Sequence, residues 1–186
     1  MEAMIKNIGI VLTVIALFGT SCDKKTEEPQ FNGEIMLSSE LLQSGQDYVF
    51  YGFSFESGKI SLYSLTSSTL PDLAAIHVIL GDTITVDLTS SNETDAFYKN
   101  STFQNATEAE AYFNNYTEVI TSDFQPLAYS VKPNQVWTIQ TENKRFAKIW
   151  IKEITYLTGS LSDFVELKIQ YEYQPDGSRT FDCGCN

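Results

Sequence analysis

The chain has 186 residues, a formal net charge of −12, one histidine and three cysteines. This acidic balance argues against nucleic-acid binding, because phosphate neutralisation requires clustered Lys and Arg side chains. One histidine excludes zinc centres built on three imidazoles, and three cysteines are too few for a disulfide scaffold. The hydrophobic fraction of 42% fits one globular domain rather than a disordered chain.

The N-terminus carries the pattern of an export signal. Lys6 precedes the apolar run 8–18 (IGIVLTVIALF), which is too short to span a bilayer but fits the hydrophobic region of a signal peptide. Small residues and then Cys22 follow directly, an order that resembles a bacterial lipobox. We expect residues 1–21 to be a lipoprotein signal peptide and Cys22 to carry the lipid, which predicts an outer-membrane lipoprotein of the cell envelope. The alternative is an ordinary secretory signal in which Cys22 has no role.

Residues 22–44 are expected to form a tether and a first segment, ahead of a β domain over 45–182. The polar stretch 23–33 (DKKTEEPQFNG) is typical of a flexible linker. From residue 48 the residues alternate between two faces, and the second face carries Val49, Tyr51, Phe53 and Phe55. This period of two predicts a strand.

Further strands are predicted along the chain. The apolar run 73–80 (LAAIHVIL) has the length and composition of a strand buried on both faces. Gly81-Asp82 separates it from the alternating, β-branched segment 83–88, and this arrangement predicts a hairpin. The polar residues 89–106 predict a long loop.

One helix and three more strands complete the predicted fold. Thr107-x-x-Glu110 is a capping box, and apolar residues at helical spacing extend the predicted helix over 107–121. Strands are expected at 135–141, 146–158 and 163–173, with a turn at 175–177 (PDG). Many strands and one short helix indicate an all-β fold, either an antiparallel sandwich or an open barrel.

Several segments, in this order, resemble the HmuY family of haem-binding cell-envelope lipoproteins. The matching pieces are 48–55 (YVFYGFSF) followed by Gly58-Lys59, 72–74 (DLA), 144–151 (KRFAKIWI) and 171–181 (YEYQPDGSRTF). The resemblance covers roughly residues 45–181. It implies an all-β fold, and it implies capture of haem for iron acquisition.

The resemblance also implies axial ligands for haem iron, for which His, Met, Cys and Tyr side chains serve. Past the signal peptide, His77 is the one histidine and Met36 the one methionine, so these two are the candidates. The competing interpretation makes His77 a neutral core residue with a hydrogen-bond partner, and Met36 a core or strand-edge residue. The alternative function is a non-haem surface module that binds a glycan, a peptide or a partner lipoprotein.

Two other patterns bear on function. Cys183-Gly-Cys185 lies in the C-terminal tail 183–186, where an oxidising envelope favours a disulfide; a metal-binding or redox tail and a tail without a role are the alternatives. Motifs of nucleophilic, phosphate-binding and metal-dependent enzymes are missing, so we expect no catalytic function and no metal site. A hydrolase built on a carboxylate pair is not excluded, but no pair stands out.

Overall fold

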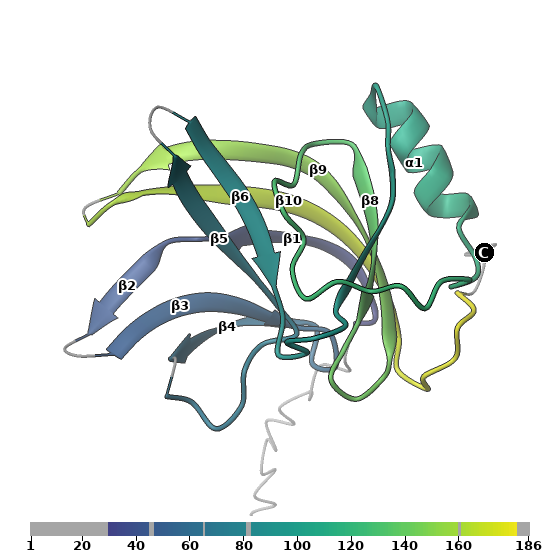
Figure 1. The fold of residues 1–186 in the computed structure, drawn as a ribbon, viewed down its shortest axis with the longest axis horizontal. Coiled ribbons are helices and arrows are strands. Elements are labelled where there is room, and N and C mark those ends of the chain that lie inside the picture. Colours follow the sequence, from purple (N-terminus) through teal and green to yellow (C-terminus); the bar gives the residue numbers. More distant parts are fainter. Residues whose placement is uncertain (1–29, 45–46, 65, 81–82, 160, 182–186) are drawn as a thin grey trace, which may run out of the picture.

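The computed structural model describes residues 30–44, 47–64, 66–80, 83–159 and 161–181. Over these residues the chain forms two antiparallel sheets packed face to face, with one short helix on the outside (Figure 1). The sheets do not close into a barrel, so the all-β prediction is confirmed in its sandwich form. The signal segment, Cys22 and the C-terminal pair Cys183 and Cys185 lie outside the described residues.

The first sheet, here the long sheet, has the strand order β1-β10-β9-β8-β7. Its strands are β1 (Asn32–Ser38), β7 (Phe97–Thr102), β8 (Gln135–Gln140), β9 (Phe146–Thr158) and β10 (Asp163–Gln174). The last three confirm the strands expected from the sequence. β1 lies in the segment 22–44, expected to hold a tether and a first segment, and only Asn32 and Gly33 fall in the stretch expected to be a flexible linker. Its seven residues pair with β10 from Asn32↔Glu172 to Ser38↔Glu166.

The second sheet, here the split sheet, has the order β2-β3-β5-β6, with β4 on the far side of β3. Its strands are β2 (Leu41–Ser44), β3 (Asp47–Ser54), β4 (Lys59–Ser64), β5 (Leu73–Leu80) and β6 (Thr83–Thr89). β5 and β6 pair from Ala74↔Thr89 to Leu80↔Thr83, which confirms the predicted hairpin.

The core lies between the two sheets and is rich in aromatic rings. Phe53 and Phe55, which share one face of the alternating segment, are fully buried, and their rings meet edge to face at 5.2 Å. Tyr171 of β10 lies 4.9 Å from the Phe53 ring, and Tyr173 stacks on Phe55 at 5.5 Å. Such ring pairs stabilise the packing beyond the apolar area they bury.

The helix is shorter than predicted. α1 spans Ala106–Asn115, and its N-cap is Asn105, whose side chain accepts the Glu108 N–H, instead of the predicted Thr107. Beyond the helix, Val119 donates its N–H to the Arg179 carbonyl oxygen at 2.7 Å. Pairing with the C-terminal segment therefore takes over from the helix before residue 121.

Two further predictions need correction. The predicted loop 89–106 contains the strand β7, whose polar residues lie on the edge of the long sheet against β8. β5 is not buried on both faces, because Ile76 and Ile79 are 45% and 56% exposed. β7 is an edge strand of the long sheet, where polar side chains are common. β5 pairs with β3 at two positions only and then separates from it.

Candidate functional site

The split sheet divides next to the short stretch where β3 and β5 are paired. Only Gly52↔Ala74 and Phe53↔Leu73 join the two strands. Beyond these pairs β2 takes the place next to β3, from Leu41↔Phe50 onward, and β5 turns away with β6. Figure 1 shows the β2–β3 and β5–β6 pairs diverging like the arms of a fork.

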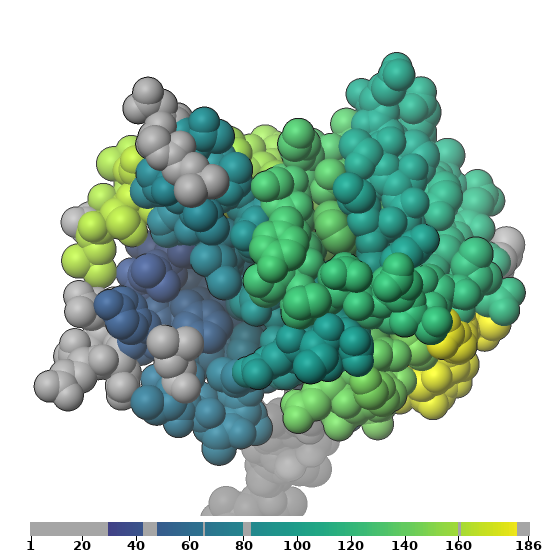
Figure 2. All heavy atoms as spheres, viewed as in Figure 1, coloured from purple at the N-terminus to yellow at the C-terminus, as the bar shows by residue number. Residues whose placement is uncertain are grey.

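A cavity of about 450 Å³ lies in this division, and we call it the fork groove. In Figure 2 the surface is recessed between the β5–β6 hairpin and the blue-violet β2–β3 strands. Its walls are mostly apolar, with two aromatic rings from β3. The lining residues are Ser39, Leu41, Tyr48, Phe50, Leu70, Pro71, Ala74, Ala75, Ile76, His77, Thr89, Ser90, Ser91 and Glu93.

His77 reaches the groove from β5 and is half-buried there. Its Nδ1 lies 3.2 Å from the hydroxyl oxygen of Ser39, which follows β1. Ser39 is itself buried and fixed: its N–H donates to the Val165 carbonyl oxygen at 2.8 Å, and its Oγ accepts the Val165 N–H at 2.9 Å. The Ser39 hydroxyl at the edge of the long sheet therefore orients the imidazole, and among the described residues Nε2 has no hydrogen-bond partner.

Met36 does not join His77. In β1 its neighbours Ile35 and Leu37 pack in the core, so Met36 points to the opposite face of the long sheet, where it is 50% exposed. The acidic Glu34 lies on that same outer face and pairs with Lys152 and Lys168. The structure thus places one of the two ligand candidates in the fork groove and the other on the outside of the sandwich.

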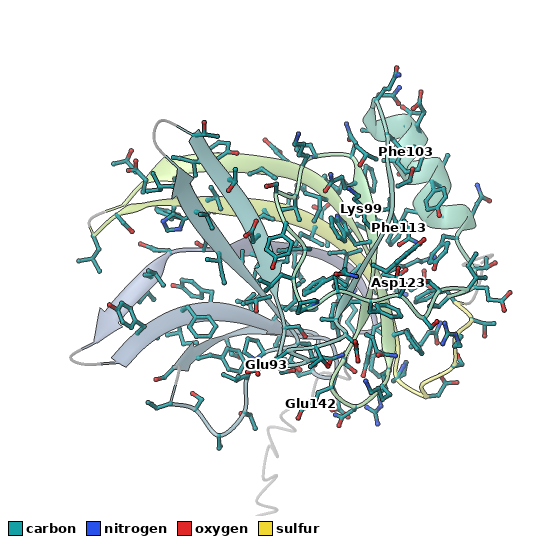
Figure 3. The ribbon with its side chains drawn as sticks, in the orientation of Figure 1. Glu93, Lys99, Phe103, Phe113, Asp123 and Glu142 are labelled. Atoms are coloured by element: carbon teal, nitrogen blue, oxygen red, sulfur yellow. The ribbon has the colours of Figure 1, made fainter. Side chains whose placement is uncertain are left out.

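A second, polar cavity adjoins the fork groove and shares Leu70, Ser91 and Glu93 with it. We call it the acidic cavity. It measures about 670 Å³ and is lined further by Ser54, Glu56, Tyr63, Ser67, Ser68, Thr69, Asp72, Glu142 and Asn143. Figure 3 shows Glu93 and Glu142 near each other at this end of the molecule.

Asp72 is the most perturbed carboxyl of the acidic cavity. Burial raises its pKa, while the Phe55 N–H, which donates to Oδ2 at 2.9 Å, acts in the opposite direction. Burial also raises the pKa of the Tyr63 phenol, and the Asp72 charge adds to that effect. Because Asp72 holds the end of β3, we assign it a structural role in positioning the segment that enters β5.

The described part of the chain contains no group of three or more His, Cys, Asp or Glu side chains arranged to hold a metal ion. Within the same residues, no helix has the length and apolar character needed to cross a membrane. No family model, curated protein or solved structure matches this chain.

Sequence reasoning found His77 but missed the residues around it. Tyr48 and Phe50 occupy the face of β3 opposite the core residue Phe53. Their alternation therefore predicts an apolar outer surface, and exposed apolar surfaces of this kind mark binding sites. Ser39 has no such signal, because its role depends on the β1–β10 register. The division of the split sheet likewise has no local signature in the sequence.

Proposed function

We propose that this protein is a lipid-anchored binding protein of the cell envelope whose fork groove takes haem or a related flat tetrapyrrole. The observation that supports this proposal is the position of His77, the one histidine of the chain. Its imidazole lies in an apolar groove, and Nε2 has no hydrogen bond to any residue that the structure describes. The groove volume is within the range of about 300–1,000 Å³ that small-molecule sites occupy.

The residues that line the groove can supply one protein ligand to haem iron, which is His77. A ligating histidine usually donates its second ring N–H to a fixed acceptor, which orients the ring. Ser39 Oγ can accept the Nδ1 hydrogen, so Nε2 would be the atom available to hold the iron, and Tyr48 and Phe50 would supply apolar ring surface to the group. When bound, haem would supply an iron centre whose properties depend on the axial ligand. We propose His77 alone as the protein's axial ligand, without Met36.

Titration of hemin into the soluble domain tests the proposal. We expect a shift of the Soret band at micromolar hemin, and His77→Ala should abolish or alter it because the axial nitrogen is lost. Met36→Leu is the matched control and should behave like the wild type, because Met36 lies on the outer face of the long sheet. An unchanged hemin spectrum with the wild-type domain would refute haem capture.

A peptide-binding module is the second candidate, and the free edge of β5 favours it. Beyond Ala74, β5 pairs only with β6 among the described residues, so its other edge presents backbone groups to the fork groove. Such edges accept an extended peptide as an added strand. Protection of the Ala75–Val78 amides from hydrogen exchange by an added peptide, with no hemin response, would favour this function. Unchanged exchange would count against it.

A further inference from the structure

The fork groove is lined by one charged side chain, and that side chain is acidic. Glu93 is the one charged residue among those that line the groove, and none of the lining residues is Lys or Arg. Haem carries two carboxylates on one edge, and binding sites with basic side chains neutralise such groups. The fork groove has no such partner among the residues that line it.

The neighbouring acidic cavity adds further carboxyl groups close to Glu93. It meets the groove at Glu93 and adds the carboxyls of Glu56, Asp72 and Glu142. Arg145 approaches this region, but its Nη1 pairs with Glu56 at 2.8 Å. Glu93 and Glu142 have no ion pair among the described residues. An anionic edge placed at this end of the groove would therefore meet the carboxylates of Glu93 and Glu142, which no ion pair among the described residues offsets.

We infer that the fork groove selects flat apolar ligands whose edge is uncharged, and that Glu93 is the residue that disfavours carboxylates. This inference rests on the proposed binding of a tetrapyrrole and specifies its chemical class. It makes the groove a better site for an esterified or carboxylate-free porphyrin than for haem with both carboxylates ionised. Like charges a few ångströms apart in water change affinity by a small factor, which salt reduces.

Hemin and hemin dimethyl ester, both in a neutral detergent, test the inference in the wild type, Glu93→Gln and Glu110→Gln. Glu110 is the matched control, because it is exposed on α1, at the opposite end of the molecule from the fork (Figure 1). We expect the ester to bind the wild type more tightly than hemin. Glu93→Gln should tighten hemin binding about threefold to fivefold at low salt and leave the ester unchanged. Added salt should reduce the gap between the two ligands.

The outcomes separate the two proposals. Equal or tighter binding of hemin than of its ester, or an equal effect of Glu110→Gln and Glu93→Gln, would overturn the charge selection while leaving tetrapyrrole binding in place. No binding of either porphyrin would overturn tetrapyrrole binding and the selection together. Tighter binding of hemin to Glu93→Gln alone, with the ester unaffected, supports the inference.

Discussion

Lys148 is the buried charge on which the attachment of α1 depends. Its side chain is 2% exposed, and its Nζ donates to the carbonyl oxygens of Phe113 and Tyr116 at 3.0 Å each. It also pairs with Glu172 at 2.9 Å. These carbonyls lie at the C-terminal end of the helix, where a cation stabilises the free carbonyl groups. Figure 3 shows Phe113 in the region between the helix and the long sheet.

Replacement of Lys148 by Met removes these contacts and leaves the Glu172 carboxylate without its partner. Loss of one partner from a buried pair costs about 3–5 kcal/mol. Glu172 is 20% exposed, and partial hydration places the expected loss near the lower end, about 3 kcal/mol. In a domain of this size that loss corresponds to a decrease in Tm of about 6–12 °C.

Urea denaturation followed by tryptophan fluorescence measures the loss. Lys152→Met is the control, because its Nζ also pairs with a glutamate, Glu34 at 2.7 Å, but at the surface. Such exposed pairs contribute less than about 1 kcal/mol. A free energy of unfolding for Lys148→Met within about 1 kcal/mol of the wild type would refute the reasoning. Combining it with Glu172→Gln should restore part of the loss, since no unpaired charge then remains.

Three further predictions concern Asp72, Gly52 and Cys22. Because folding raises the pKa of Asp72, its stabilising contribution is complete below the ordinary value of 3.8 and is lost as the pH rises through the folded value. In urea titrations the stability of Asp72→Asn should therefore fall less than that of the wild type as the pH rises above the ordinary Asp value, and parallel curves would contradict this. A Cβ on Gly52 would clash with the Pro71 ring, so Gly52→Ala should cost about 1–3 kcal/mol, and an unchanged Tm would contradict this. Cys22→Ser should abolish labelling by an alkyne palmitate analogue and release the chain from the membrane fraction; continued labelling would argue against the lipid anchor.

Where the sequence predicts the fold well, the pattern is local. Strands β8, β9 and β10 and the β5–β6 hairpin follow from alternation and turn residues that belong to the strands themselves. The predicted helix end fails because it depends on distant partners: Ile120 continues the apolar spacing, yet it is 84% exposed. There the chain pairs with Arg179 instead, so tertiary contacts override helical periodicity.

The candidate site is harder to predict for the same reason. His77 attracts attention as the one histidine, but the groove around it is lined by residues of four strands, β2, β3, β5 and β6, and it forms because β3 and β5 stop pairing after Ala74. Met36 shows the converse: its residue type suits iron, but the register of β1 turns it to the outer face. Residue type thus identifies chemistry, whereas register decides which side chains meet.

The pairing of β1 with β10 sets the order in which the protein can assemble. Among the described strands, β1 is synthesised first and β10 last, so the ladder between Asn32 and Glu172 cannot form before Glu172 has been synthesised. Contacts between residues so distant along the chain slow folding, because a long loop must close first. A chain threaded through a membrane from its N-terminus cannot complete the long sheet until its final strand has passed. In the proposed export, the long sheet would therefore form only after β10 has crossed the membrane.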